Sequence, residues 1–138
     1  MPVTLDINTF SIDQTIETTN TTTKEDVHLF AQVTGDTNPV HLDDDYAATT
    51  SFGKTIAHGM LTAGFISAAI GTRLPGPGCI YLEQSLKFRA PVFIGDTVTT
   101  RLTIVDINVR RKRLTLKTEC IVNDKVVVSG EAVIMIPI

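Results

Sequence analysis

The segment at residues 58–71, HGMLTAGFISAAIG, constrains the fold more than any other part of the sequence. Apolar and small residues cover nearly every face of the helix that it predicts, and such a helix is a buried one in a soluble protein. LPGPG at residues 74–78 then ends this helix with strong breakers. The rest of the chain must therefore supply the surface that covers the helix.

The second half of the chain predicts that covering surface, because nearly all of it is typical of β-strands. β-branched and alternating segments occur at residues 80–88, 98–107, 114–122 and 126–136. Asn123-Asp124 predicts a hairpin turn between the last two strands, and TIETT at residues 15–19 predicts an edge strand. These patterns favour an α+β fold, with an antiparallel sheet wrapped around a central buried helix. Because such a sheet has exposed edges, we expect a homodimer.

Length, charge and cysteine content bound the class of protein. A chain of 138 residues is expected to form a single domain over residues 1–138. The net charge of −3 gives no case for binding nucleic acid, and the lack of a run of about 20 apolar residues predicts no membrane span. Cys79 and Cys120 belong to no CxxC pair, and MPVTLDINTF lacks the features of a signal peptide. We therefore expect a reduced, cytoplasmic protein.

The segment at residues 34–41, TGDTNPVH, carries the strongest chemical signal. A helix capped by Thr23 is predicted to end at Gly35, and Asn38-Pro39 predicts a turn. Asp36 and His41 therefore flank a bend that can direct both side chains at one point. A carboxylate and an imidazole that share one water can act as general base and general acid near neutral pH.

A metal site is the alternative interpretation of this region. His41 and Asp43 could in principle bind a metal, but Asp43, Asp44 and Asp45 are explained by capping of a short helix. The sequence has no second histidine or carboxylate set at a known ligand spacing. We predict neither a metal nor a cofactor.

Other residues leave two interpretations open. Gly59 in the first helical turn either relieves crowding or exposes backbone amides as an oxyanion site, and the two are compatible. The Ser67 hydroxyl is best explained, from the residues alone, by a hydrogen bond to the carbonyl of Ala63. The basic run at residues 110–113 is typical of a solvated hairpin tip, with contact to an anionic group such as a phosphate as the alternative. Lys87 and Arg89 raise the same question.

Several segments together resemble one known family. FAQVTGDTNPVHLDDDYA at residues 30–47 is similar to the signature of the MaoC-like, (R)-specific enoyl-CoA hydratases, also called the hydratase 2 family. The resemblance continues through AHGMLTAGFIS, YLEQSLKFRAPVFIGD and SGEAVI. It implies a hot-dog fold, a dimer, and (R)-specific hydration of trans-2-enoyl-CoA to (R)-3-hydroxyacyl-CoA by syn addition, reversibly. The short chain resembles the enzymes that supply polyester (polyhydroxyalkanoate) synthesis.

The resemblance also implies roles for individual residues. Asp36 and His41 would be the catalytic pair, and Asn38 would hold their loop in place. Gly59 would offer its amide to the thioester carbonyl, while Ser67 would support the catalytic site, against the preference drawn from the residues alone. The implied partner is an acyl-CoA thioester, and no CoA-contacting residue is carried over. Met60 and Phe65 are open to two interpretations, as walls of an acyl channel or as plain core.

Three other functions are compatible with the sequence. The nearest is a 3-hydroxyacyl-ACP dehydratase of fatty-acid synthesis, which runs the same chemistry on a carrier-bound substrate. A hot-dog thioesterase would hydrolyse the thioester instead. A non-catalytic acyl-CoA-binding module is the third, although a protein that only binds does not need both Asp36 and His41.

Overall fold

The computed structural model describes residues 4–137 and consists of one antiparallel sheet with a long helix on one face. The strand order is β1-β4-β5-β6-β2, and the short strand β3 also pairs with β6. The helices and strands, in chain order, are η1 (Ile7–Thr9), β1 (Thr15–Thr21), α1 (Lys24–Thr34), α2 (Pro39–Leu42), α3 (Asp44–Ala48), α4 (Gly59–Thr72), β2 (Ile80–Gln84), β3 (Lys87–Phe88), β4 (Thr97–Asn108), β5 (Arg113–Val122) and β6 (Lys125–Met135).

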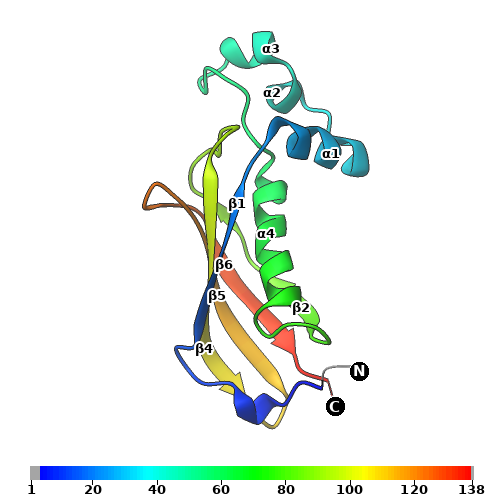
Figure 1. The fold of residues 1–138 in the computed structure, drawn as a ribbon, viewed down its shortest axis with the longest axis vertical. Helices are drawn as coiled ribbons and strands as arrows, with labels where there is room; N and C mark the ends of the chain where they lie inside the picture. The colour runs from blue at the N-terminus through cyan, green and yellow to red at the C-terminus, as the bar shows by residue number, and fades with distance from the viewer. Residues whose placement is uncertain (1–3, 138) are drawn as a thin grey trace.

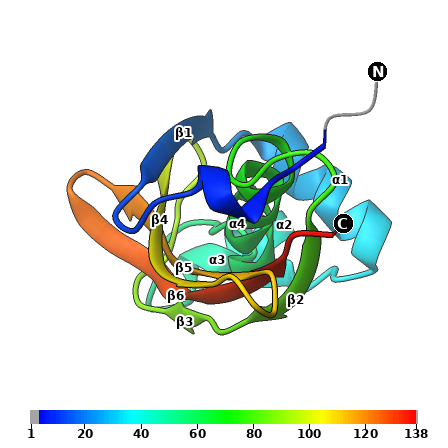
Figure 2. The same ribbon diagram turned by 90° about the horizontal axis from the view of Figure 1, so that it is seen from below.

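The sheet curves around α4, which lies along it with the short helices α1, α2 and α3 gathered beyond its first turn (Figures 1 and 2). This arrangement confirms the predicted α+β architecture and the order of its strands along the chain. The predicted edge strand is also confirmed, because β1 pairs only with β4.

The core lies between α4 and the concave face of the sheet. Burial alternates along β4 and β5, as expected for strands with one covered face. The fully buried apolar strand side chains are Val98, Leu102, Ile104, Leu114, Leu116, Cys120, Ala132 and Ile134. The side of α4 that faces them carries Thr62, Ala63, Ile66, Ala69 and Ile70. Small alanines on this side let the helix approach the sheet closely.

The other side of α4 is exposed within a single chain, which departs from our expectation of a fully buried helix. Met60, Gly64, Ser67 and Ala68 all lie on this side. The physical reason is that one curved sheet covers a helix from one direction only. An apolar helix face without cover suits contact with another surface.

Local sequence signals formed as predicted. Thr23 and Asp26 make a reciprocal capping box at the start of α1, and Gly35 ends that helix with φ 80°. Asn123 and Asp124 both have positive φ, 49° and 63°, as a two-residue hairpin turn requires. Each of these signals involves residues close in the sequence.

The strand predicted at residues 80–88 is wrong as a continuous element, because it is divided into β2 and β3. Between them the backbone of Ser85 crosses close to β6, where its amide donates to the Glu131 carbonyl at 2.9 Å. A Cβ on Gly130 would lie 1.8 Å from the Ser85 carbonyl oxygen. The glycine therefore permits a backbone approach that the strand pattern of residues 80–88 does not reveal.

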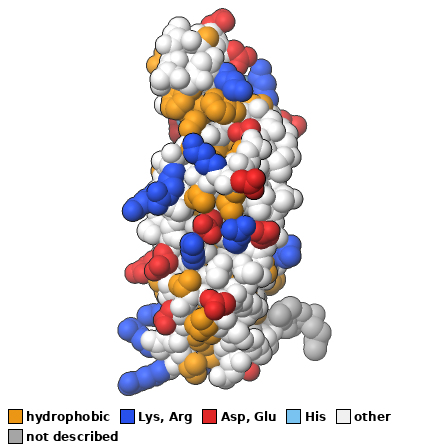
Figure 3. Space-filling model, turned by 90° about the vertical axis from the view of Figure 1, so that its left-hand side faces the viewer, with side chains coloured by type: hydrophobic (Ala, Val, Ile, Leu, Met, Phe, Trp, Pro, Cys, Tyr) orange, Lys and Arg blue, Asp and Glu red, His pale blue; other side chains and the backbone are white. Residues whose placement is uncertain are grey.

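The outer face of the sheet carries mixed charges (Figure 3). Arg101 on β4 donates to Glu17 on β1 at 2.7 Å and lies 3.9 Å from Glu119 on β5. These partly exposed cross-strand pairs add little stability individually. Within residues 4–137, no helix is long and apolar enough to cross a membrane.

The close approach at Gly130 gives a stability prediction. We expect Gly130→Ala to lower the free energy of unfolding by about 1–3 kcal/mol or more, because the clash is with backbone and cannot be relieved by a rotamer change. Urea denaturation followed by circular dichroism measures this loss. Glu131→Ala is the matched control, since it removes only an exposed side chain on the same strand. Equal stability of Gly130→Ala and wild type would contradict the packing described here.

Candidate active site

Asp36 is held in the link between α1 and α2. Its amide donates to the Thr34 hydroxyl at 3.1 Å, and its carboxylate accepts from the Asn38 amide at 3.3 Å. Asn38 in turn caps α2, because its side-chain oxygen accepts from the Val40 amide at 3.2 Å. The carboxylate itself is on an exposed residue. Short-range hydrogen bonds thus set the bend that the sequence predicts between Asp36 and His41, although Pro39 there begins the short helix α2, which was not predicted.

His41 lies on α2 and is half-buried. Its Nδ1 lies 2.7 Å from the carbonyl oxygen of Ile56. A carbonyl oxygen can only accept, so Nδ1 carries the hydrogen in this arrangement. The lone pair of the neutral ring is then on Nε2, which is the nitrogen available to a bound molecule.

His58 completes the cluster from the start of α4. Its side chain is 2% exposed, and its Nε2 lies 3.0 Å from the Asp36 carbonyl oxygen. The ring centroids of His58 and His41 are 3.9 Å apart, and Phe30 lies at 4.7 Å from the His58 ring. Ligand-type atoms of Asp36, His41 and His58 lie within 4.8 Å of one another. The two predicted site residues Asp36 and His41 are thus brought together, as expected.

The burial of His41 lowers its pKa from the ordinary value of 6.5. The loss of water around the charged ring is the largest cause, and the charge of nearby His58 acts in the same direction. The hydrogen bond to Ile56 and the carboxylate of Asp36 act in the opposite direction and only partly offset it. A lowered pKa keeps the imidazole unprotonated, and able to accept a proton, at neutral pH.

Gly59 begins α4 beside these side chains. Its amide has no acceptor within the helix, and no partner for it is found among residues 4–137. A Cβ at this position would lie 2.7 Å from ring atoms of Phe88. The preceding segment is fixed to the sheet, since the Ala57 amide donates to the Val92 carbonyl at 2.7 Å. The positive end of α4 is therefore held rigidly at the site.

These groups border a cavity of about 530 Å³. Its polar walls come from Asp36, His41, His58, Thr62 and Arg89, and its other walls are mainly apolar. The apolar and backbone-lined part consists of Phe52, Ile56, Ala57, Gly59, Met60, Phe88, Ala90, Pro91, Val92 and Val128. A pocket with one polar end and mostly apolar walls suits a molecule that has a reactive polar group and an acyl chain.

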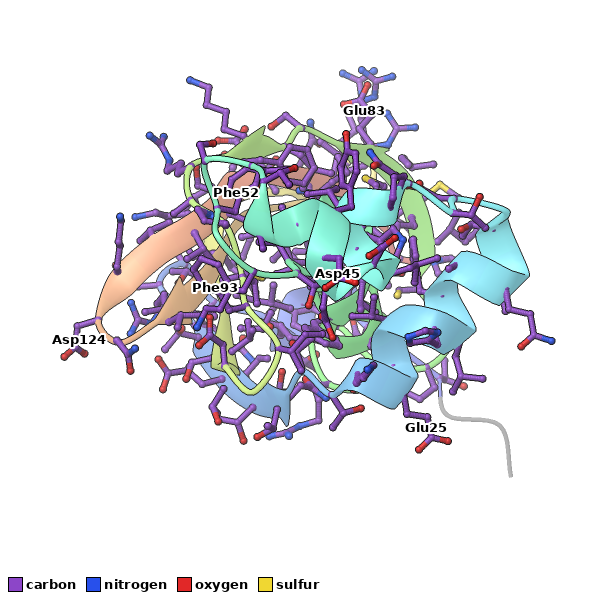
Figure 4. The ribbon with its side chains drawn as sticks, turned by 90° about the horizontal axis from the view of Figure 1, so that it is seen from above. Glu25, Asp45, Phe52, Glu83, Phe93 and Asp124 are labelled. Atoms are coloured by element: carbon purple, nitrogen blue, oxygen red, sulfur yellow. The ribbon has the colours of Figure 1, made fainter. Side chains whose placement is uncertain are left out.

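The cavity lies at the end of the molecule that carries α1–α3. In the view onto this end, Phe52 and Asp45 lie on the segment that covers it, and Asp124 projects from the β5–β6 hairpin at the side (Figure 4). Phe52 follows α3 and lines the cavity, whereas Asp45 does not. The segment that follows α3 thus forms part of the cavity wall.

The remaining predicted residues divide between this cavity and the outside. Met60 lines the cavity, while Phe65 lies in a separate groove beside α1. Ser67 is on the exposed side of α4 and outside the cavity, and it makes no side-chain hydrogen bond to any of residues 4–137, including the expected one to Ala63. Asn38 does not line the cavity but caps the helix that carries His41. A supporting role for Ser67 remains a prediction.

The three clustered side chains need not indicate a metal centre. One nitrogen of each histidine lies against a backbone carbonyl, at Ile56 and Asp36 respectively. The two rings are also tilted against each other, with 31° between their planes. On each ring, one of the two nitrogens that could bind a metal is thus already directed at a backbone carbonyl. The geometry suits proton transfer better than coordination.

Comparison with known proteins places the chain in a family. Residues 8–126 match the model of the MaoC like domain. The chain belongs to the MaoC-like family. An (R)-specific enoyl-CoA hydratase of Rhodospirillum rubrum is 54% identical over 124 residues, which cover 90% of this chain and 86% of that protein.

Solved structures of MaoC-like relatives agree with the fold. An R-hydratase from Pseudomonas aeruginosa superposes with a TM-score of 0.91 at 45% identity, covering 97% of this chain and 86% of that one. An (R)-hydratase from Aeromonas caviae, described as involved in PHA biosynthesis, gives 0.90 at 39% identity, with 93% and 98% covered. The predicted hot-dog fold is confirmed by these likenesses.

Sequence reasoning did not identify all the residues at this MaoC-like site. His58 was considered only as the neighbour of Gly59, although it bonds to Asp36 and stacks on His41. Phe88 was assigned only to a strand, yet it covers Gly59. A histidine directly before a glycine at the start of an apolar helix was the available signal for His58. The Phe88 contact had no local signal, because it joins two distant segments.

The lowered pKa of His41 gives a titration prediction. By NMR we expect His41 to titrate below 6.5, and Asp36→Asn to lower its pKa further by removing the carboxylate charge that raises it. Because the folded pKa is below the unfolded one, the stability that His41 contributes is present above pH 6.5 and is lost as pH falls through the folded pKa.

The control for this titration is Asp45→Asn, which removes an exposed acid on α3 that does not face the cavity. It should leave the His41 titration unchanged. An upward shift of the His41 pKa in Asp36→Asn would contradict the charge relationship between the two side chains.

Proposed function

We propose that this protein is an (R)-specific enoyl-CoA hydratase, which adds water to trans-2-enoyl-CoA to give (R)-3-hydroxyacyl-CoA, and catalyses the reverse dehydration. The observation that carries the proposal is that Asp36, His41 and the Gly59 amide, which has no partner among residues 4–137, lie around one cavity. The 54% identity to a hydratase of this name supports the reaction class. The apolar remainder of the cavity has the chemistry of an acyl-chain site.

Charge on the thioester oxygen is the main chemical obstacle to hydration. Water can attack C3 only if the electron pair displaced from the C2–C3 double bond reaches the thioester carbonyl as an enolate. The Gly59 amide, at the positive end of α4, would donate to this oxygen. Removal of one such donor typically costs about 3 kcal/mol of transition-state stabilisation.

His41 has the features of the group that moves the proton. Its Nδ1–H is used by Ile56, so Nε2 is free to take a proton from the attacking water. The oxygen of that water bonds to C3, and the same proton then passes from Nε2 to C2. Asp36, whose carboxylate can only accept hydrogen bonds when ionised, would orient the water and stabilise the imidazolium. Both additions come from one face, which accounts for syn stereochemistry.

The group that carries the acyl chain as a thioester, CoA or a carrier protein, separates this proposal from the carrier-protein alternative. A 3-hydroxyacyl-ACP dehydratase would use the same three groups on a differently attached substrate. Arg89 at the cavity wall is a cationic side chain within reach of an anionic handle, and its Nε donates to Ser129 at 2.7 Å. Since both handles contain phosphate, this residue fits either. The high identity to a CoA-named relative favours CoA.

The functional test is the loss of enoyl ultraviolet absorbance when the protein meets crotonyl-CoA, with chiral analysis of the product. We expect rapid loss and (R)-3-hydroxybutyryl-CoA. Asp36→Asn and His41→Ala should each lower turnover by more than about 100-fold, the usual range for acid–base groups. His28→Ala, an exposed histidine on α1, is the matched control and should retain activity.

Contrary outcomes of this assay identify the competing functions. Near-wild-type turnover in a folded Asp36→Asn protein would refute the assignment of the catalytic pair. Activity confined to a carrier-protein substrate would support the dehydratase of fatty-acid synthesis. Release of free thiol, detected with a thiol reagent, would identify a thioesterase. Tight binding of acyl-CoA without turnover would favour a binding module.

We also infer that two copies of the chain form a homodimer through β2 and the exposed side of α4. Ile80, Tyr81 and Leu82 on this edge strand are 41%, 38% and 41% exposed, and Met60 on α4 is 56% exposed. An apolar edge strand favours pairing with another strand, and a second copy supplies one. Ser67 lies on this side of α4, so a partner copy would also cover it.

We further propose a cellular compartment and a pathway, each supported by a separate observation. Cys79 and Cys120 are free thiols, and burial raises the pKa of Cys120 to about 11, which keeps it protonated and unreactive. Free cysteines suit the reducing cytoplasm. The likeness to a hydratase described as involved in PHA biosynthesis supports a supply of (R)-3-hydroxyacyl-CoA to polyester synthesis.

The dimer proposal predicts the mass of the protein in solution. Light scattering after size-exclusion chromatography should give twice the chain mass of 15.0 kDa. Leu82→Lys places a charge on the pairing edge and should shift the mass towards that of one chain. Val109→Lys, at an exposed apolar position on the β4–β5 turn, is the control and should remain a dimer. A wild-type protein with the mass of one chain would contradict the proposal.

A further inference from the structure

His58 is an unusual residue for its position. It is the N-cap of α4, yet its side chain makes no capping hydrogen bond. The side chain is 2% exposed, and its Nε2 instead contacts the Asp36 carbonyl, 22 residues earlier in the chain. Burying an imidazole costs free energy unless its polar atoms are satisfied. Helix capping therefore does not explain why an imidazole is buried at this position.

The contacts of His58 connect all the proposed reacting groups. Its backbone carbonyl accepts from the Leu61 amide at 3.0 Å, in the first turn of the helix that begins with Gly59. Its Nε2–H bond holds the backbone of Asp36, and its ring lies against that of His41. Phe30 contacts the ring from α1. His58 thus joins α1, the α1–α2 link and α2 to the first turn of α4.

The remaining nitrogen fixes the chemical form in which His58 can do this. Because the Asp36 carbonyl only accepts, Nε2 carries a hydrogen. Nδ1 is buried and has no hydrogen-bond partner among residues 4–137. A second hydrogen there would lack an acceptor among these residues. The side chain is therefore suited to hold other groups, and not to exchange protons with a substrate.

We propose that His58 is a positioning residue, whose Nε2–H bond to the Asp36 carbonyl holds the Asp36–His41 pair in register with the Gly59 amide. This inference rests on the proposed hydratase function. Its consequence is geometric: without the bond, the α1–α2 link is free to shift relative to α4. A displacement of about 1 Å in a reacting group can lower turnover by about 100-fold.

Three substitutions separate the hydrogen bond from the packing of the ring. In His58→Gln, the amide nitrogen keeps an N–H at the position of Nε2. In His58→Asn, the shorter side chain places its amide nitrogen near Nδ1, from which it cannot reach Asp36. In His58→Phe, the aromatic ring is kept but the hydrogen-bond donor is lost. We expect the Gln variant to retain kcat within about 5-fold of the wild type. The Asn and Phe variants should each have a kcat lower by about 50- to 100-fold, while their KM changes by less than about 3-fold. Circular dichroism and thermal unfolding verify that each variant is folded.

A double variant tests whether His58 acts through Asp36. In the Asp36→Asn background, His58→Phe should cause a smaller fold-loss of kcat than it does in the wild type, because one of the two side chains that His58 positions is already removed. Thr100→Val, a buried polar substitution in β4 outside the cavity, measures the effect of lost stability alone and should retain kcat.

The outcomes distinguish this inference from the proposed function. Failure of the wild-type protein to hydrate enoyl thioesters refutes the proposed function. If the wild-type protein is active, two results overturn the inference. One is a wild-type kcat in His58→Phe, and the other is a loss of kcat in His58→Gln as large as that in His58→Phe. The inference is also overturned if the loss of kcat in every variant is proportional to its loss of thermal stability. If Asn or Phe does not fold, the comparison of Gln with wild type decides, and a 50-fold loss in folded His58→Gln overturns it.

Discussion

The packing of α4 against the concave sheet is the interaction on which the rest of the structure depends. Its buried side combines Ala63 and Ala69 with Ile66 and Ile70, so the helix axis can approach the strands closely while larger side chains fill the space beside it. A helix held in this way cannot slide or rotate without opening cavities. The position of its first amide, at Gly59, is therefore determined by the core, together with the hydrogen bond from the Ala57 amide to the Val92 carbonyl just before it.

The side chains of the site depend on a different kind of interaction. α1, α2 and α3 lie beyond the end of α4 and are joined to it by few contacts (Figure 1). Hydrogen bonds to backbone carbonyls connect the parts: His41 with Ile56, His58 with Asp36, and the Ile56 amide with Val40 at 3.3 Å. Each bond spans segments that the core alone does not fix. The oxyanion donor thus belongs to the rigid part of the molecule, and the acid–base pair belongs to a part that a few hydrogen bonds hold in place.

This division explains which features the sequence could predict. The Thr23 cap, the αL residue Gly35 and the Asn123-Asp124 turn each depend on atoms within a few residues, so composition and spacing suffice. The strand pattern also predicted the sheet, because burial on one face imposes a period of two. The break between β2 and β3 was missed, since it depends on Ser85 meeting Gly130. That contact joins residues 45 positions apart, and no local pattern encodes it.

The same reasoning applies to the candidate site. The bend carrying Asp36 and His41 was predictable because Gly35, Asn38 and Pro39 define it locally. The contacts of His58 were not, because its acceptor is a backbone carbonyl, which any residue at position 36 would provide. A pattern of side chains cannot reveal a partner that has no side-chain signature. Phe88 over Gly59 is similar, since the glycine shows that space is needed but not what occupies it.

The chemical roles of the two histidines follow from these carbonyl contacts. Both rings donate to a carbonyl, but the second nitrogen of His58 is buried, whereas His41 is half-buried at the cavity wall. The two histidines, whose rings are in contact, are thus suited to different roles: His58 to a structural one and His41 to proton transfer. Burial and the neighbouring ring lower the His41 pKa, while Asp36 limits that decrease. A base whose pKa is too high is already protonated at neutral pH and cannot accept a proton from water. A base whose pKa is too low accepts the proton only weakly. The His41 imidazole is therefore unprotonated near neutral pH, with burial as the main cause of its lowered pKa and the Asp36 carboxylate opposing that decrease.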